Sequence, residues 1–377
     1  MFGNISNPNI LSTEVKDMDM RKIGILFLFL LLFSSLISSQ TNIENPEEPL
    51  SKNAGRVLKL EEIFRITDES DDFYFSWPLD LKVDSEGSFF LLDENQILKF
   101  SSDGKFLKNL FKKGQGPGEI SSSSHSRLSY FLLKNGIFLY DPTGNKIIHM
   151  DGDGNLIEEV KLEVSLLSEL YGPANEGFIF ADEAPAPLGK SGFYDVDMSI
   201  IWVSRDGSSS RKVMVFPKEL YVYKNFARDW APFYSLLEID SQNLFVCHTS
   251  EYNIVLADLG KNQVIKKFNR KYRRIKYAMT ESQKQFYQRI KVKPPERKHK
   301  NDILGLFLNK GNLWVKTSKS DKKKGVLIDV FNKEGKYIDN FYLNLKGEIM
   351  AVQGDFIFAS EKDEDENIQI VKYKMIR

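Results

Sequence analysis

The sequence predicts an all-β fold, a six-bladed β-propeller whose last blade is completed by an N-terminal strand. Three observations lead to it: a repeat of short apolar strands, two sets of turn signals that alternate along the chain, and a strand candidate that precedes the first repeat. The chain has 377 residues, of which 42% are hydrophobic and 12% aromatic. This is enough apolar surface for a large core, and a repeat-built β fold of this length can form one domain.

The repeat consists of short runs rich in aromatic and β-branched residues, separated by Gly, Asn and Asp. The turn after the first strand of each repeat is marked by Gly87, Gly136, Gly177, Asn243, Gly311 and Gly354. A later hairpin turn follows at Asp103-Gly104, Asp153-Gly154, Asp206-Gly207, Gly260-Lys261 and Glu334-Gly335. Asp-Gly supplies the positive φ of a tight hairpin, and a period of about 40–70 residues with several strands per repeat indicates propeller blades.

The last repeat suggests how the ring closes, because it offers only three strand candidates, 348–352, 355–360 and 367–376. A lone strand candidate, 56–66, lies before the first repeat. If it became the outer strand of the last blade, the sheet edge would be paired and the two ends of the chain would be tied together. A β-sandwich, or two smaller β domains, is the alternative, although a sandwich does not require a phased repeat.

The N-terminal part has the order of a secretory signal peptide. A basic start, Met20-Arg21-Lys22, precedes fifteen mostly apolar residues, 23–37, and a short polar stretch. The apolar run is shorter than the ~18–20 residues that span a bilayer comfortably. We therefore expect an extracytoplasmic protein, periplasmic or secreted, after cleavage; an N-terminal membrane anchor that is not cleaved is the alternative.

The expected domain boundaries follow from these segments. Residues 1–40 are the N-terminal extension and signal peptide, with Met20 as the expected start. Residues 41–54 are a polar linker. Residues 55–377 form the propeller, with a basic insertion at about 269–301.

Cysteine content and overall charge narrow the class of protein further. Cys247 is the only cysteine, so no intrachain disulfide framework is possible. Export without disulfides suits a bacterial protein better than a eukaryotic extracellular one. Lys plus Arg equals Asp plus Glu, 52 each, so the overall charge predicts no nucleic-acid partner.

Residues 114–119, Gly-Gln-Gly-Pro-Gly-Glu, form the most distinctive motif and follow the strand at 96–100 and the turn Asp103-Gly104. In this order the chain resembles a bacterial six-bladed β-propeller family related to NHL repeats. The resemblance implies an exported propeller; such propellers mainly serve as binding platforms, and a few are enzymes. Ile120 stands where many relatives have an aromatic residue, so the resemblance does not extend to a shared ligand.

The glycine motif has two interpretations on physical grounds. Three glycines around Pro117 permit backbone shapes closed to other residues, which suits a crossover between blades one and two. Successive exposed amides could instead form an anion-binding nest. The candidate ligand contacts here are Gly114, Gln115, Gly116, Gly118, Glu119 and, in the serine-rich loop that follows, His125.

No catalytic, cofactor or metal site is predicted. The four histidines are His125, His149, His248 and His299, and they do not lie at metal-ligand spacing. Asp151-Gly152-Asp153 resembles the start of a calcium loop, but Leu162 occupies the position where an EF-hand needs Glu. Four acidic residues follow second strands and could point toward the channel: Asp93, Asp141, Asp182 and Glu183.

The basic insertion is the one strong local charge asymmetry. Residues 270–300 contain twelve Lys and Arg against two Glu, a net charge of +10. Thr280-Glu281-Ser282-Gln283 has the order of a capping box and predicts a helix that runs to Ile290. A strand over 273–277 would place Arg274 and Lys276 on one face and Arg273 on the other. The candidate contacts for an anionic partner are Arg273, Arg274, Lys276, Lys284 and Arg289.

The function that these observations favour is an exported, non-catalytic binding or scaffold propeller, monomeric and without a cofactor. Its ligand would be a protein, a glycan or another envelope component. The alternative is an extracytoplasmic hydrolase or lyase with an active site at the channel. Three or more Asp, Glu or His side chains within bonding reach at the channel mouth would indicate the enzyme, whereas aromatic and neutral polar groups would indicate binding.

Overall fold

The computed structural model describes residues 40–67, 72–121, 128–134, 136–163, 168–174, 176–183, 192–223, 226–231, 233–238, 243–289, 291, 294 and 296–376. The predicted signal peptide with its start at Met20, and His125, lie outside these residues. The chain divides after Gln40, and the unit Thr41–Arg377 is the one described below.

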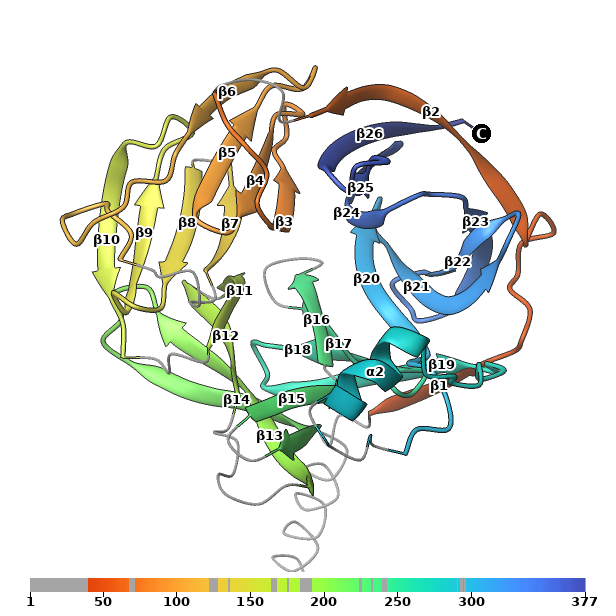
Figure 1. Cartoon of the computed structure of the whole chain (residues 1–377). Helices are drawn as coiled ribbons and strands as arrows, with labels where there is room; N and C mark the ends of the chain where they lie inside the picture. The colour runs from red at the N-terminus through yellow and green to blue at the C-terminus, as the bar shows by residue number, and fades with distance from the viewer. Residues whose placement is uncertain are drawn as a thin grey trace, which may run out of the picture. The chain divides into compact units, whose positions relative to one another are not determined.

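This unit is a six-bladed β-propeller, as the sequence predicts (Figure 1). Blade I contains β3 (Pro78–Val83), β4 (Phe89–Asp93), β5 (Gln96–Phe100) and β6 (Phe106–Asn109). Blade II contains β7 (Ser129–Leu133), β8 (Gly136–Asp141), β9 (Lys146–Met150) and β10 (Leu156–Lys161). Blade III contains β11 (Glu169–Ala174), β12 (Gly177–Glu183), β13 (Gly192–Ser204), β14 (Ser210–Tyr223) and β15 (Phe226–Ala231).

The remaining three blades contain the C-terminal half of the chain and both N-terminal strands. Blade IV contains β16 (Phe233–Glu238), β17 (Asn243–His248), β18 (Asn253–Asp258), β19 (Gln263–Arg270) and, on its outer edge, β1 (Thr41–Asn45). Blade V contains β20 (Ile303–Asn309), β21 (Asn312–Asp321), β22 (Gly325–Phe331) and β23 (Tyr337–Leu343). Blade VI contains β24 (Glu348–Gln353), β25 (Phe356–Lys362), β26 (Ile368–Ile376) and β2 (Arg56–Ile66).

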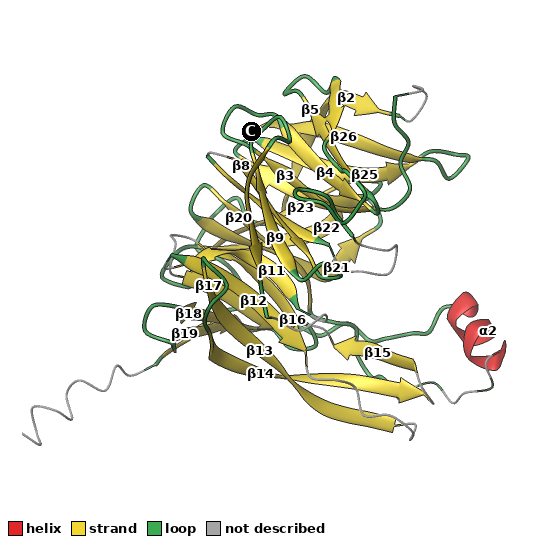
Figure 2. Ribbon diagram, turned by 90° about the vertical axis from the view of Figure 1, so that its left-hand side faces the viewer, coloured by secondary structure: helices red, strands yellow, loops and turns green. Residues whose placement is uncertain are grey.

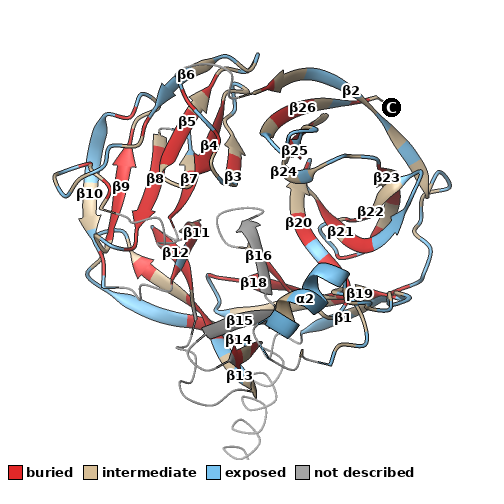
Figure 3. Cartoon of the chain, viewed as in Figure 1, coloured by how far each residue is buried: buried red, intermediate tan, exposed pale blue. Residues whose placement is uncertain are grey.

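The first strand of each blade is the innermost one, and these six strands are β3, β7, β11, β16, β20 and β24. Each contacts the first strands of both neighbouring blades, including β24 with β3. The buried side chains lie mainly in the central strands of the blades, where neighbouring sheets face each other (Figure 3). Cys247 lies within this core, between β16 and β18, and is 1% exposed.

The predicted turn glycines lie where the repeat places them, and two of them show why glycine is needed. Gly104 and Gly154 have φ angles of 87° and 77°, which glycine adopts without strain. A Cβ on Gly104 would lie 2.9 Å from the ring of Phe64, and one on Gly154 would lie 2.9 Å from Leu110. In both cases the neighbouring side chain belongs to the preceding blade, so each hairpin turn packs directly against it.

Strand β2 closes the ring as predicted and also does more than predicted. Its residues from Lys59 to Ile66 pair antiparallel with β26 and complete blade VI. Its first residues, Arg56 to Leu58, pair in parallel with β23, the outer strand of blade V. The strand has 11 residues, so it is long enough to bind both blades, and blades V and VI form one continuous eight-stranded sheet.

The range expected to be a polar linker, 41–54, begins with a strand instead. β1 pairs in parallel with β19. The side chain of Asn45 is buried: its amide nitrogen donates to the carbonyl of Gly335 (2.9 Å), and its oxygen accepts from the backbone N–H of Tyr337 (2.9 Å). Backbone pairing with β19, the buried hydrogen bonds of Asn45 and the packing of Ile43 against the core attach this polar segment to blades IV and V.

The basic insertion between blades IV and V contains helix α2 (Glu281–Arg289), as predicted. The capping box is formed, since the N–H of Thr280 donates to Oε1 of Gln283 (2.9 Å) and the N–H of Gln283 donates to Oγ1 of Thr280 (3.3 Å). None of the helix residues is buried, and the helix stands apart from the sheets (Figure 2). No strand forms over 273–277. Residues 275–277 lie beside 298–300 instead, with a single bridge from Lys276 to His299 and backbone hydrogen bonds from Tyr277 to Lys298 (3.0 Å) and from Lys300 to Ile275 (2.8 Å).

Candidate functional site

The acidic residues that follow second strands anchor the backbone within their own blades. Asp93 is completely buried, and its carboxylate accepts hydrogen bonds from the N–H groups of Ser76 (2.8 Å) and Trp77. Burial raises the pKa of Asp93, the two N–H groups oppose this, and the net pKa is raised. Asp93 therefore fixes the chain just before it enters β3.

The same arrangement recurs in the next two blades. Asp141 accepts from the N–H of Ser121 (2.7 Å), before β7, and Asp182 accepts from the hydroxyl of Ser168 (2.8 Å), before β11. The side chain of Glu183 lies outside the described ones. These carboxylates bind the backbone or a hydroxyl group of their own blade, so their position reflects blade construction.

Two of the described histidines, His149 and His248, contact neighbouring side chains of the protein. His149 stacks on Phe138 with the ring centroids 3.9 Å apart, and Nδ1 of His248 lies 2.5 Å from the hydroxyl of Ser250. Burial lowers the pKa of His248, against an opposing effect of Glu251. In the described part of the chain, no three His, Cys, Asp or Glu side chains lie close enough together to hold a metal ion.

A groove of about 1020 Å³ lies where blades V, VI and I meet, and we call it the channel groove. Its lining includes the innermost strands of these blades and, in blades V and VI, residues of the strands beside them. Its apolar part is lined by Trp77, Leu79, Leu304, Ile349 and Met350. Three of these side chains are unusually exposed for their type: Trp77 is 69%, Leu79 50% and Leu304 39% exposed. A contiguous exposed apolar surface with a polar rim is typical of a binding site.

Two sets of contacts hold residues of the channel groove in place: a backbone hydrogen bond at Trp77 and ion pairs on the rim. Asp93 holds the backbone N–H of Trp77, so the indole ring is exposed on an anchored backbone. On the rim, Lys316 is paired with Glu348, and Lys362 lies 2.6 Å from Glu366. These rim carboxylates are engaged by ammonium groups and leave an apolar centre between charged edges.

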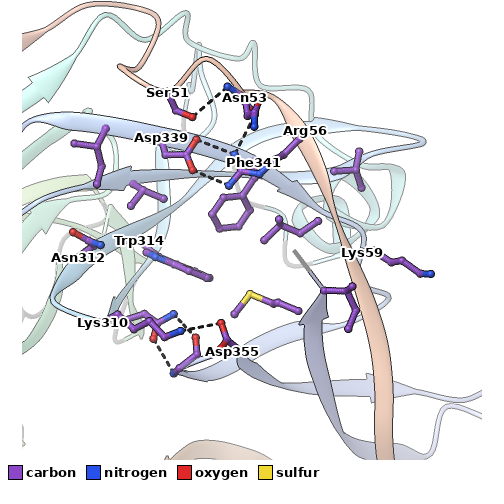
Figure 4. Close-up of a pocket in the computed structure, with 18 residues that line it drawn as sticks. Ser51, Asn53, Arg56, Lys59, Lys310, Asn312, Trp314, Asp339, Phe341 and Asp355 are labelled. Atoms are coloured by element: carbon purple, nitrogen blue, oxygen red, sulfur yellow. Dashed lines mark hydrogen bonds and ion pairs between the residues drawn. The ribbon is translucent and has the colours of Figure 1, made fainter.

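A second cavity, of about 720 Å³, lies between blades V and VI beneath β2 (Figure 4). Two ion pairs border it: Arg56 with Asp339 (2.8 Å) and Lys310 with Asp355 (2.9 Å). Trp314 contributes to its apolar wall.

The channel groove and the cavity between blades V and VI, which we call the inter-blade cavity, differ in how exposed their apolar lining residues are. In the inter-blade cavity, Trp314, Phe341 and Met375 are only 8%, 3% and 7% exposed. Trp314 packs edge-on against Phe341 with the ring centroids 4.9 Å apart. These side chains are core residues that join β2 to both blades, so the channel groove offers a ligand more apolar surface.

The glycine motif lies in the crossover from blade I to blade II, and its amides are bonded within the protein. The N–H of Gly116 donates to the carboxylate of Glu119 (2.9 Å), and the N–H of Gly118 donates to Glu159 of β10 (2.9 Å). The N–H of Gly114 donates to the carbonyl of Ile120 (3.1 Å). The loop thus resembles an anion nest that contains the protein's own carboxylates.

Two further residues complete the picture of this loop. Lys146, whose side chain is 5% exposed, donates to Glu159 (2.9 Å) and to the carbonyl of Gly116 (3.3 Å). Gln115 is exposed at the tip. Of the residues proposed as contacts in this motif, Gln115 has the most accessible side chain.

Two of the basic residues proposed as a patch, Arg274 and Lys284, form ion pairs with carboxylates. Arg274 lies 3.2 Å from Asp302, and Lys284 lies 3.1 Å from Glu281 on its own helix. The guanidinium of Arg289 lies 5.8 Å from the ring centroid of Phe286. Arg273 alone lines a pocket, together with basic residues from other parts of the chain that the sequence did not connect.

Comparison with known proteins agrees with this fold. Residues 61–199 match a family model described as a 6-bladed beta-propeller. The sequence matches no curated protein. Within the part of the chain that the structure describes, no helix has the length and apolar character needed to cross a membrane.

Solved structures of low sequence identity are similar over most of the chain. A Bacteroides fragilis protein described as exported is 14% identical, covers 89% of this chain and all of its own, and has a TM-score of 0.50. A member of the DUF4221 family from Bacteroides vulgatus is 11% identical, with coverage of 85% and 99% and a TM-score of 0.52. A gluconolactonase from Xanthomonas campestris is 12% identical, with coverage of 86% and 96% and a TM-score of 0.43. The blades, the family match over residues 61–199 and the first two of these structures identify the fold of the chain as a six-bladed β-propeller.

Proposed function

We propose that the chain is an exported, non-catalytic propeller that binds an envelope component, protein or glycan, in the channel groove. The observation that carries this proposal is the exposure of Trp77, Leu79 and Leu304 together at the innermost strands of blades I and V. Exposed tryptophan on an anchored backbone is the kind of side chain that dominates binding energy at interfaces.

The charged groups of the channel groove support binding rather than catalysis. Glu348 and Glu366 are paired with lysines, and Asp321 accepts the N–H groups of Lys323 (2.8 Å) and Lys324 (2.9 Å). General acid–base catalysis needs a carboxylate or imidazole in reach of the reacting group with a suitable pKa. The groove's described carboxylates instead have internal partners.

Export is supported by two independent observations. The N-terminal sequence has the order of a signal peptide, with a basic start, an apolar run of fifteen residues and a polar stretch. The similar Bacteroides fragilis protein is described as exported. We infer an extracytoplasmic location for this chain as well.

The test is capture of envelope components by the immobilised protein and by a variant with Trp77→Ala and Leu304→Ala. We expect the variant to retain at least about tenfold less of any specifically bound component, because truncation of a central aromatic anchor typically costs 2 kcal/mol or more. Both substitutions remove exposed side chains, so the melting temperature should stay close to that of the parent.

The matched control carries Leu107→Ala and Ile157→Ala, which remove side chains that are 51% and 53% exposed on outer strands, away from the channel. This control should capture as the parent does. Equal capture by the parent and the Trp77 variant would exclude the channel groove as the binding surface. Chemical conversion of the captured component by the parent would contradict the non-catalytic part of the proposal.

A further inference from the structure

A smaller cavity at the junction of blades IV and V has a different chemistry from the channel groove. It has a volume of about 210 Å³, and four basic side chains line it: Arg270, Arg273, Lys319 and Lys324. Arg270 ends β19, Arg273 begins the insertion, and the two lysines lie at the end of β21 and in the turn that follows. We call this cavity the basic pocket.

Arg270 is a buried cation that the protein holds in place from several sides. Its Nε donates to Asp329 (2.7 Å), and its guanidinium carbon lies 4.8–5.2 Å from the ring centroids of Tyr252, Tyr272 and Tyr337. Burial lowers the pKa of Arg270, but Asp329 and the tyrosines raise it more, so its net pKa is raised and the group stays charged.

In this cluster the carboxylate of Asp329 is fully hydrogen-bonded, whereas the guanidinium of Arg270 is not. Asp329 accepts from Tyr252 (2.6 Å), Tyr337 (2.7 Å) and Arg270, so both of its oxygens are satisfied. Nη1 of Arg270 donates to the carbonyl of Lys271 (3.1 Å). Nη2 is buried and has no acceptor among the described residues. A buried donor without an acceptor costs free energy, so the cluster lacks one acceptor.

The other three cations differ from Arg270, which forms an ion pair with Asp329. Arg273, Lys319 and Lys324 are exposed, and none of them forms an ion pair with a described residue. Lys324 lies over the ring of Tyr342, with its Nζ 5.3 Å from the ring centroid. Neighbouring basic residues differ in this respect, since Arg274, only one residue along, is paired with Asp302.

The remaining polar side chains that line the basic pocket are those of Asn340, whose Oδ1 accepts from the N–H of Gly55 (2.6 Å), Tyr342, Glu47 and Glu48. Burial, followed by Asp321 and Asp329, raises the pKa of Tyr342, so its hydroxyl remains a donor at neutral pH. Glu47 and Glu48, from the segment after β1, are exposed lining residues. Together with Asp329, which pairs with Arg270, they reduce the charge at the pocket from four positive groups to a net of one.

We propose that the basic pocket binds a tetrahedral oxyanion, the phosphate or sulfate group of a larger ligand. Its donors come from three separate segments and so approach from different directions, which suits an anion with oxygens in three dimensions better than a planar carboxylate. Guanidinium groups pair well with such oxyanions, and lysines add point charges. The volume accommodates one such group but is smaller than the pockets of ~300–1,000 Å³ that enclose whole drug-sized ligands.

The test is calorimetric titration of the purified protein with inorganic phosphate and with inorganic sulfate. We expect saturable binding of one equivalent. The variant with Arg273→Ala and Lys324→Ala should bind at least about tenfold more weakly, because a hydrogen bond to a charged group contributes about one such factor or more. Both side chains are exposed, so the fold should be unaffected, which circular dichroism verifies.

The matched control removes the same charge from helix α2, with Lys284→Ala and Arg289→Ala. It should bind as the parent does, because neither residue lines the basic pocket. Equal weakening in the control, or the absence of saturable binding by the parent, would overturn the proposal, since either result reduces the pocket to a general surface charge.

Two further arms sharpen the result. Glu47→Gln with Glu48→Gln removes the opposing charges, and we expect anion binding to become about two- to tenfold tighter; weaker binding would contradict the assigned geometry.

Sedimentation with phosphatidylcholine vesicles that contain phosphatidic acid distinguishes the sources of phosphate. Retention that depends on Arg273 and Lys324 identifies a lipid headgroup, whereas binding of the free ions alone identifies a soluble ligand; both agree with the pocket.

Discussion

The glycine motif and the basic pocket both concentrate hydrogen-bond donors, but they differ in how many of these donors the protein's own acceptors satisfy. In the motif, residues 114–119, the carboxylates of Glu119 and Glu159 accept from two loop amides. In the basic pocket, Arg270 retains a buried nitrogen without an acceptor among the described residues, and three exposed cations have no carboxylate partner. The first is an anion site filled by the protein's own carboxylates; the second directs cationic donors from separate segments toward one cavity.

The difference teaches which sequence signals report on function. A motif of adjacent residues is easy to recognise, and here its regularity reflects the backbone geometry of one crossover. The basic pocket combines residues from 47 to 342 and has no compact signature. In this chain the glycine-rich motif serves the backbone geometry of a crossover. The candidate sites are instead formed by residues that are far apart in the sequence and come together only in the fold.

The largest expected effect comes from Asp329→Asn, which removes the one internal anion beside Arg270. The guanidinium would remain buried without its carboxylate, so we expect a loss of about 3–5 kcal/mol in the free energy of unfolding. Chemical denaturation measures it. The control Glu281→Gln breaks an exposed ion pair with Lys284 and should cost no more than about 0.5 kcal/mol.

The Asp329→Asn variant also tests whether the basic pocket differs from the glycine motif in its response to added anions. Phosphate or sulfate should restore part of the lost stability in Asp329→Asn, because an oxyanion bound in the basic pocket would supply negative charge near Arg270 in place of the lost carboxylate. The same salts should not do so in the Glu281→Gln control beyond their general effect on stability. Equal stabilisation of both variants would remove the contrast between a filled site and an open one.

A smaller effect is expected from Gly114→Ala in the glycine motif. A Cβ at this position would collide with the carboxylate of Glu119, which must move and release the N–H of Gly116. The loss of one hydrogen bond to a charged group predicts a destabilisation of about 1–3 kcal/mol. Thermal unfolding measures it, and an unchanged melting temperature would show that the motif does not depend on this internal carboxylate.

Much of the fold could be predicted from the sequence because turns and strands are local. Gly104 and Gly154 occupy the expected hairpins, and Thr280 and Gln283 form the expected helix cap. β1 could not be predicted, since its attachment depends on buried hydrogen bonds of Asn45 to residues nearly 300 positions away.

The candidate sites were less accessible to sequence reasoning. Trp77 gave no signal, because neither the exposure of its side chain nor the hydrogen bond of its backbone N–H to Asp93 can be read from a single tryptophan in the sequence. The pairing of Arg274 with Asp302 divides the predicted basic patch, and charge counting does not reveal such pairs. The lysines at 319 and 322–324 were the available sequence signal for the basic pocket, but a charge run usually indicates only a solvated turn.

The smallest expected effect is a pH dependence at the filled site. Burial raises the pKa of Glu159, but the N–H of Gly118 and the ammonium of Lys146 lower it more, so the net pKa in the folded protein is below its usual value of about 4.3. A carboxyl group with a depressed folded pKa stabilises the fold fully above its unfolded pKa and loses this contribution as the pH falls through the folded pKa. Glu159→Gln removes the titrating group, so the melting temperatures of parent and variant should differ most near neutral pH and converge below about pH 4. Glu281→Gln is the control, because Glu281 is exposed and should give a small difference at every pH. A gap between parent and Glu159→Gln that stays constant from neutral pH to pH 3 would mean that Glu159 contributes shape rather than charge, and the loop would then no longer be an anion site filled from within.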